Sequence, residues 1–245
     1  MKVSVIIPTW NERDNVGPLL RGVAQALEGH DFDIVVVDDS SPDGTAQVVR
    51  ELSHQDGRIR LLTREGKLGL ASAVLDGMAL ASGEALVVMD ADLSHPPEAL
   101  PHLLRPLEDS YAVVVGSRYV PGGRIEGWPP LRRLSSRLAT LLAKGLLGLA
   151  VKDPMSGFAA FRRNVLEQLP TRYSARGFKL LAEVLATTPG LRVAEVPITF
   201  TDRTRGRSKF SLGEVGRFGL LCLRLWLWRQ RNLPRRPRGI PSSER

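Results

Sequence analysis

The sequence predicts an α/β fold in which a mostly parallel β-sheet is flanked by helices. Short apolar segments alternate with longer segments of helical spacing through the first half of the chain. The short segments are apolar on both faces, as expected for strands of a parallel sheet that is covered on both sides. A chain of 245 residues has enough length for one domain of this kind.

The local sequence supports each of the first elements in turn. Residues 3–8 form an apolar run that stops at Pro8, which has no backbone N–H for continued pairing. Residues 15–27 place apolar side chains three and four positions apart, which predicts a helix. Residues 32–37 are rich in β-branched side chains and end in the turn-forming sequence of residues 38–44.

The same alternation continues to residue 116. It predicts helices over residues 45–52, 70–82 and 97–108. It predicts strands over residues 59–62, 85–89 and 112–116. Ligands of such sheets bind at the carboxyl ends of the strands. The chemistry is therefore expected at residues 8–12, 38–39, 90–92 and 116–118.

Asp90 and Asp92 form the strongest local signal, because they directly follow a buried strand. Two carboxylates this close repel each other, and a divalent cation relieves that repulsion. Mg²⁺ and Mn²⁺ prefer oxygen ligands, often one or two carboxylates together with substrate phosphates. The tripeptide occurs in many surface loops, so it is the preceding strand that favours a metal-assisted diphosphate site.

Asp38 and Asp39 end the second strand and have two interpretations. A carboxylate there can accept hydrogen bonds from a ribose or base. Turn and helix-capping chemistry explains the segment equally well, since Asp43 can cap the helix that begins at Thr45. The first strand–helix turn has no Gly-x-Gly-x-x-Gly, which disfavours a dinucleotide-dependent dehydrogenase.

Positive charge is concentrated at the end of the chain. Residues 203–245 hold twelve basic and two acidic residues, whereas residues 1–202 have a net charge of −2. This asymmetry indicates an anionic partner: nucleic acid, an anionic membrane or a phosphorylated substrate. Any single arginine is usually a solvated side chain. The cations that could face one cleft are Arg118, Arg132, Arg133, Arg203, Arg205, Arg207 and Lys209.

Two segments have the composition of membrane-surface helices, although neither reaches the length of uncharged apolar sequence that predicts a transmembrane helix. Residues 218–228 combine two tryptophans with neighbouring arginines, which favours lipid contact. Residues 131–151 are apolar but interrupted by basic side chains, and either lipid or another protein surface would cover them. The apolar run at the N-terminus is too short for a signal peptide. With Cys222 as the only cysteine, a reducing, cytoplasmic compartment is expected.

Seven stretches together resemble the polyprenyl-phosphate (dolichol-phosphate) mannosyltransferases, inverting glycosyltransferases of the GT-A fold in family 2. The resemblance runs from Val3 to about Lys209. The last four stretches are the most specific to this branch. The stretches are residues 3–15, 34–45, 67–73, 87–98, 116–123, 152–158 and 203–209.

The resemblance implies a role for individual residues. Asp90, Asp92 and, less directly, Ser94 would form the metal site, and Ser94 stands where the family can carry a longer glutamine ligand. Asp153 would orient the sugar or acceptor. Arg203 and Lys209 would clamp the donor diphosphate. The acceptor phosphate would contact Arg118, Arg132 and Ser136. The nucleotide would contact Pro8, Trp10, Glu12, Val37, Asp39, Lys67, Asp90, Ala91 and Asp92.

The implied reaction is transfer of mannose from GDP-mannose to a polyprenyl phosphate, with Mg²⁺ or Mn²⁺ as cofactor. A UDP-glucose-dependent polyprenyl-phosphate glucosyltransferase and a transferase with a saccharide or protein acceptor are alternatives. The arginines disfavour a saccharide or protein acceptor, which needs no phosphate ligands. A nucleic-acid binder leaves the aspartates at the strand ends unexplained, and no nucleic-acid partner is expected.

The expected organisation has three parts: a GT-A catalytic domain over residues 1–211, an amphipathic interfacial helix over residues 212–229, and a basic tail over residues 230–245. We expect a peripheral protein at the cytoplasmic face of an anionic membrane. The sequence makes no prediction of the oligomeric state.

Overall fold

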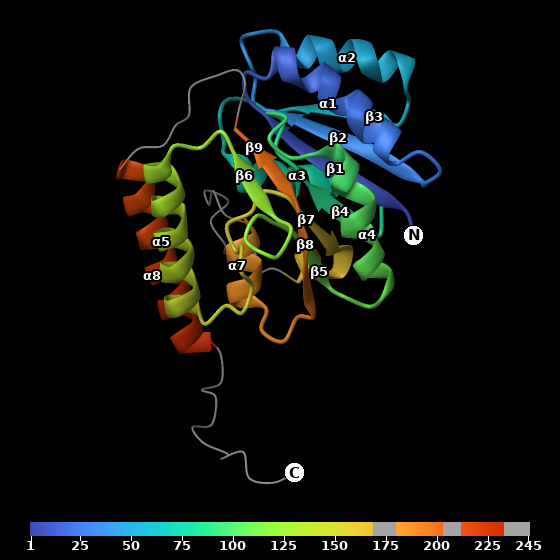
Figure 1. Ribbon diagram of the computed structural model, residues 1–245. Helices are drawn as coiled ribbons and strands as arrows, with labels where there is room; N and C mark the ends of the chain where they lie inside the picture. Colours follow the sequence, from blue (N-terminus) through green and yellow to red (C-terminus); the bar gives the residue numbers. More distant parts are fainter. Residues whose placement is uncertain (169–179, 203–211, 233–245) are drawn as a thin grey trace.

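The computed structural model describes residues 1–168, 180–202 and 212–232. Within these ranges a seven-stranded sheet is covered by helices on both faces, which confirms the expected α/β fold (Figure 1). Its strand order is β3-β2-β1-β4-β7-β5-β8. The strands are β1 (Val3–Thr9), β2 (Phe32–Asp38), β3 (Ile59–Thr63), β4 (Ala85–Val88), β5 (Val113–Ser117), β7 (Ala159–Arg162) and β8 (Val193–Pro197). A second, two-stranded sheet pairs β6 (Arg124–Glu126) with β9 (Thr199–Thr201).

The helices occupy most of the segments that have helical spacing in the sequence. The expected helix over 97–108 begins as a single 3₁₀ turn, η1 (Pro97–Ala99), before continuing as α4. The segment 131–151 is helical only to Leu147, because Gly148 adopts a left-handed φ of 61° that ends the helix. The helices are α1 (Arg13–Ala26), α2 (Thr45–Gln55), α3 (Leu70–Leu80), α4 (Leu100–Glu108), α5 (Pro130–Leu147), α6 (Arg163–Glu167), α7 (Leu180–Thr187) and α8 (Leu212–Asn232).

The core has two halves because side chains alternate across the sheet. Val3, Val5 and Ile7 of β1 join the buried cluster that contains residues of α1, α2 and α4. Ile6 points to the other face and joins the cluster with residues of α3, α5, α7 and α8. The sheet is therefore buried on both sides, which explains why its strands have apolar residues on both faces.

Strand β7 determines which loops meet at the carboxyl edge of the sheet. It lies antiparallel between β4 and β5, and the sequence patterns did not predict it. Because β7 runs in the opposite direction, its amino end lies beside the carboxyl ends of β4 and β5. The segment 153–158 therefore reaches the same edge as the segments 90–92 and 116–118.

Candidate functional site

Asp90 and Asp92 follow β4 at the carboxyl edge of the sheet, as expected. The side chain of Asp90 is 30% exposed, whereas Asp92 is buried. The Oδ1 atom of Asp92 accepts hydrogen bonds from the Ser94 hydroxyl at 2.5 Å and the Ser94 backbone N–H at 3.1 Å. Leu93 between them has a left-handed φ of 61°, a conformation that non-glycine residues rarely adopt and that concentrates at functional sites. This turn fixes the direction of the Asp92 carboxylate.

His95 forms the buried wall behind Asp90. Its ring stacks on Phe158 with centroids 5.2 Å apart, and the Asp90 backbone N–H points to His95 Nδ1 at 3.4 Å. Burial lowers the pKa of His95 and outweighs the charges of Asp90 and Asp92, so the ring is neutral near pH 7. A Cβ atom on Gly157 would lie 2.7 Å from Asp90 Oδ2, so a larger residue at this position would have to displace the Asp90 carboxylate.

Arg118 follows β5 and forms a bidentate pair with Asp153. Arg118 Nε and Nη2 each lie 2.7 Å from an Asp153 oxygen, and the Arg118 backbone N–H donates to the same carboxylate at 3.0 Å. The Asp153 side chain is fully buried, and that of Arg118 is 8% exposed. Burial opposes the charge of Arg118, but the hydrogen bonds and charge of Asp153 outweigh it and raise the pKa of Arg118; the charge of Asp90 adds to this rise. Arg118 and Asp90 are thus within electrostatic range of each other.

Glu195 on β8 supports this pair from behind, a role that the sequence analysis missed. Its carboxylate accepts the backbone N–H groups of Lys152 at 2.7 Å and Asp153 at 3.0 Å. The Arg118 guanidinium lies 5.4 Å from the ring centroid of Trp128 and at the same distance from Phe200. The arginine is therefore held by a carboxylate and by aromatic walls.

The three residues expected to contact an acceptor phosphate lie together. The Arg132 guanidinium is 4.2 Å from the ring centroid of Trp128, the ring that also faces Arg118. Arg132 Nη1 also pairs with Asp202 at 2.8 Å. The Tyr119 hydroxyl donates to the Ser136 hydroxyl at 2.9 Å and so links the end of β5 to α5. Two cations and a hydroxyl thus converge from the end of β5 and from α5.

The expected nucleotide contacts divide into surface and buried positions. Lys67 Nζ lies 4.7 Å from the ring centroid of Trp10, which brings the loops after β1 and β3 together. Glu12 accepts a hydrogen bond from Asn15 Nδ2 at 2.7 Å at the start of α1. Pro8 is partly buried near the end of β1. The Val37 side chain is fully buried in the core, so a nucleotide contact from this residue would use its backbone.

The neighbouring aspartates at the end of β2 differ in their surroundings. Asp38 accepts hydrogen bonds from Thr9 Oγ1 at 2.9 Å and from the Ser41 hydroxyl at 2.6 Å, which is turn chemistry. Asp39 is paired with buried Arg64. The N-cap residue of α2 is Gly44 rather than Asp43, but Asp43 Oδ1 accepts the backbone N–H of Thr45, the first residue of the helix, at 3.0 Å.

Asp90 and Asp92 fit a divalent cation by the chemistry of their carboxylate oxygens. Ser94 contributes less directly, because its hydroxyl donates to Asp92. Over residues 1–168, 180–202 and 212–232, no three His, Cys, Asp or Glu side chains gather to hold a metal ion. A cation at this pair would complete its shell with oxygens of a bound phosphate or water.

Several expected residues fall outside the described part of the chain. They are Arg203, Arg205, Arg207 and Lys209. The structure also adds residues that the sequence analysis did not assign to the site. His95, Tyr119 and Gly157 lie within the sequence stretches that resemble the family, and Trp128 precedes the arginines of α5. Phe200 and Glu195 carried no local signal.

This sheet, with a carboxylate pair and an arginine cluster at its carboxyl edge, defines a glycosyltransferase of the GT-A class. Residues 4–170 match the family described as glycosyl transferase family 2, and the chain belongs to that family. The expected family is thereby confirmed.

Two relatives cover most of the chain. The chain is 43% identical over 230 residues to a dolichol-phosphate mannosyltransferase of Pyrococcus furiosus, covering 93% of this chain and 64% of the relative. A dolichol-phosphate mannosyltransferase of Saccharomyces cerevisiae is 39% identical over 221 residues, covering 86% of this chain and 82% of the relative. The chain thus spans less than two thirds of the Pyrococcus protein.

A solved structure with the same fold is glucosyl-3-phosphoglycerate synthase from Mycobacterium tuberculosis, in complex with Mn²⁺, UDP and glucosyl-3-phosphoglycerate. The TM-score is 0.69 at 24% identity, and the match covers 93% of this chain and 79% of that one. At this identity the likeness establishes the fold.

Proposed function

We propose that this protein transfers mannose from GDP-mannose to a polyprenyl or dolichyl phosphate, with inversion at the anomeric carbon. The observation that carries the proposal is the convergence of Arg118, Arg132 and Ser136 at the same sheet edge as Asp90 and Asp92. Both mannosyltransferase relatives support it by their names. A saccharide acceptor would not require this pair of cations.

The acceptor supplies its own nucleophile in this reaction. An oxygen of its phosphate is already anionic near pH 7, so no general base is needed. The barrier is the approach of one anion to another. Arg118 and Arg132 reduce this electrostatic repulsion by binding the acceptor phosphate. The ion pair with Asp153 holds the guanidinium of Arg118 in place, and the Trp128 ring contacts both guanidinium groups.

In this proposal the nucleotide-sugar donor binds on the side of Asp90 and Asp92 opposite to Arg118 and Arg132. Asp90 and Asp92 would hold Mg²⁺ or Mn²⁺, which supplies charge stabilisation for the departing diphosphate. The Mycobacterium tuberculosis synthase of the same fold was solved in complex with Mn²⁺ and UDP, which supports a divalent cation in this reaction. Trp10 and Lys67 would contact the nucleotide, with Arg203 and Lys209 as a clamp on its diphosphate. These roles belong to a catalytic domain over residues 1–211.

A donor screen tests the function directly. The full chain is incubated with a short polyprenyl phosphate, Mg²⁺ or Mn²⁺, and either GDP-mannose or UDP-glucose. We expect nucleotide release and a lipid-linked sugar with GDP-mannose. Preference for UDP-glucose would identify the glucosyltransferase instead.

The matched control for the acceptor is the same polyprenol without its phosphate. It removes only the group that Arg118 and Arg132 are proposed to bind. Equal product from the free alcohol, or nucleotide release that is independent of acceptor, would contradict the proposal.

We further propose that the outer face of α5 and α8 contacts the membrane. The two helices lie side by side at the left edge of the molecule in Figure 1. Within the described residues no helix is both long and apolar enough to cross a bilayer. The large apolar side chains exposed on the pair are Leu131, Leu134, Leu138, Leu141, Leu142, Leu146, Leu220, Leu223, Trp226 and Leu227.

Helix α5 would then contact both the membrane and the phosphate of the lipid acceptor. Arg132 and Ser136 lie on α5 between its exposed leucines, and Arg133 and Arg137 are exposed beside them. Leucines can enter the headgroup region while arginines pair with anionic lipid. The face therefore suits a peripheral contact that brings a polyprenyl chain to the site.

Replacing Leu134 and Leu141 with glutamate should weaken membrane binding. These side chains are 55% and 64% exposed, so the change places charge on the lipid-facing surface without disturbing the core. We expect the fraction that floats with phosphatidylglycerol-containing vesicles to fall roughly tenfold. Leu80→Glu on α3, at a leucine 39% exposed, is the matched control and should float as the unmodified protein does. Undiminished flotation of the double variant would contradict this face as the contact.

A further inference from the structure

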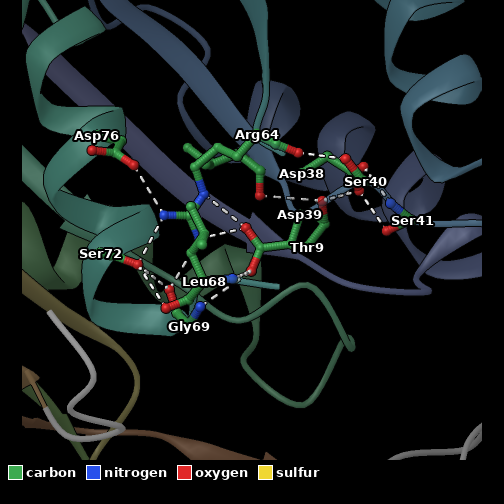
Figure 2. A network of polar contacts seen from close by, with 11 residues as sticks. Thr9, Asp38, Asp39, Ser40, Ser41, Arg64, Leu68, Gly69, Ser72 and Asp76 are labelled. Atoms are coloured by element: carbon green, nitrogen blue, oxygen red, sulfur yellow. Dashed lines mark hydrogen bonds and ion pairs between the residues drawn. The ribbon is translucent and has the colours of Figure 1, made fainter. Parts of the chain in front are cut away.

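Arg64 is the centre of a buried polar network at the end of β3 (Figure 2). Its side chain is 4% exposed, and all five of its N–H donors have acceptors. Nε donates to Asp39 Oδ1 at 2.7 Å, and Nη1 donates to Ser72 Oγ at 2.8 Å and Asp76 Oδ2 at 2.9 Å. Nη2 donates to Asp39 Oδ1 and to the Gly69 carbonyl, the latter at 3.1 Å. Arg64 therefore has no donor left for a ligand.

The Asp39 carboxylate is equally engaged. Arg64 occupies Oδ1, while Oδ2 accepts the backbone N–H groups of Leu68 at 3.1 Å and Gly69 at 3.3 Å. A carboxylate offers about four lone-pair sites, and four N–H groups fill them here. A nucleotide that hydrogen bonds to Asp39 must share an oxygen either with Arg64 or with the loop, so all three are coupled through this side chain.

The loop held in this way carries a proposed nucleotide contact. Lys67 precedes the two N–H groups that bind Asp39, and its Nζ lies 4.7 Å from the Trp10 ring centroid. The backbone adds to the attachment, because the Arg64 N–H donates to the Asp38 carbonyl at 2.8 Å. The Ser40 hydroxyl donates to the Arg64 carbonyl. Arg64 thus joins the ends of β2 and β3, the loop of residues 65–69 and α3.

We propose that Arg64 is a positioning residue for the donor site: through Asp39 and the loop 65–69 it sets the affinity for the nucleoside diphosphate part of the donor. The inference rests on the proposed function for the identity of the donor. It predicts a separation of effects, because the acceptor contacts follow β5 or lie on α5, and among the residues that the structure describes they share no hydrogen bond with this network.

Arg64→Lys tests the proposal by keeping the charge and removing the planar fork of donors. We expect the KM for GDP-mannose to rise roughly tenfold or more, since several charge-assisted hydrogen bonds are lost. The KM for the polyprenyl phosphate and kcat at saturating donor should stay within about twofold, because those contacts lie outside the network. An unchanged donor KM, or an equal rise of both KM values, would overturn the proposal.

Asp76→Asn provides a second, milder variant should Arg64→Lys fail to fold. The Asp76 side chain is 49% exposed and contacts the guanidinium from the solvent side, so the fold should tolerate the change. Donor KM should rise severalfold with an unchanged acceptor KM; an unchanged donor KM would overturn the inference. Arg58→Lys is the matched control. Arg58 directly precedes β3, whereas Arg64 directly follows it, and Arg58 pairs with Asp56 at the surface.

Calorimetric titration of GDP with Mg²⁺ separates this inference from the proposed function. It reports nucleotide affinity without turnover. Unmodified protein that binds GDP but transfers no mannose would end the proposed function, whereas the comparison of GDP affinity between Arg64→Lys and unmodified protein still tests the positioning role. Equal GDP affinity in the two proteins would contradict the positioning role of Arg64.

Discussion

Replacing Asp92 with alanine is expected to abolish sugar transfer while leaving the fold intact. Asp92 is buried at the end of β4, and Ser94 directs its carboxylate. Loss of the carboxylate would remove half of the proposed cation site and with it the stabilisation of the leaving diphosphate. We expect a loss of at least about a thousandfold in transfer rate. Initial rates of nucleotide release, together with circular dichroism of the variant, measure both parts of the prediction.

Two comparisons make the Asp92 result specific. Asp109→Ala removes an exposed carboxylate at the end of α4 and should leave the rate unchanged. Ser94→Ala should lower the rate only about tenfold, because Asp92 keeps its charge but loses one orienting hydrogen bond. Treatment of the unmodified protein with EDTA should reproduce the Asp92 defect. Full activity in Asp92→Ala or in EDTA would refute the metal role.

Replacing Asp153 with alanine is expected to damage stability and transfer together. The change leaves the Arg118 guanidinium buried without its counter-charge, and breaking a buried ion pair from one side costs about 3–5 kcal/mol. Arg118 would also lose the bidentate contact that aims it at the acceptor phosphate. Urea unfolding measures the first effect, and the KM for polyprenyl phosphate measures the second.

The double variant Arg118→Met with Asp153→Leu separates these effects. Replacing a buried pair with apolar side chains is often neutral for stability, so much of the lost unfolding free energy should return. Transfer should stay low, because the phosphate ligand is gone. Unaltered stability and acceptor KM in Asp153→Ala would show that the pair has neither role.

The site and the membrane-facing helix pair are linked through α5 in this proposal. Arg132 and Ser136 belong to the same helix as the exposed leucines, so the position of the helix on a bilayer would set the height of the acceptor phosphate. This arrangement would let a soluble nucleotide sugar and a lipid meet without a transmembrane segment in the described part of the chain.

Local sequence predicted the elements whose signal is local. The apolar run into Pro8, the β-branched run into Asp38 and the spacing of Val16, Leu19 and Leu20 all predicted elements within a few residues of their observed bounds. Each signal depends on side-chain periodicity and turn chemistry, which neighbouring residues determine. The strand-end rule likewise placed Asp90 and Asp92 at the edge of the sheet.

Short elements without such a local signal were not predicted, because their formation depends on residues that are distant in the sequence. Strand β7 has four residues and β9 has three, and the sequence patterns predicted neither. Their existence depends on pairing with distant partners, such as Val88 with Ala159. Because the sequence did not predict β7, it could not show that the segment containing Asp153 returns to the edge of the sheet where Arg118 lies.

The sequence by itself determined the fold class, the carboxylate pair and the family, since these depend on contiguous residues. Only the tertiary structure decided the partners: Arg118 with Asp153, Glu195 behind them, and Arg64 with Asp39. These pairs join residues 25 to 42 positions apart. The physical reason is that burying a charge requires a counter-charge, and the fold, rather than the local sequence, selects which residue supplies it.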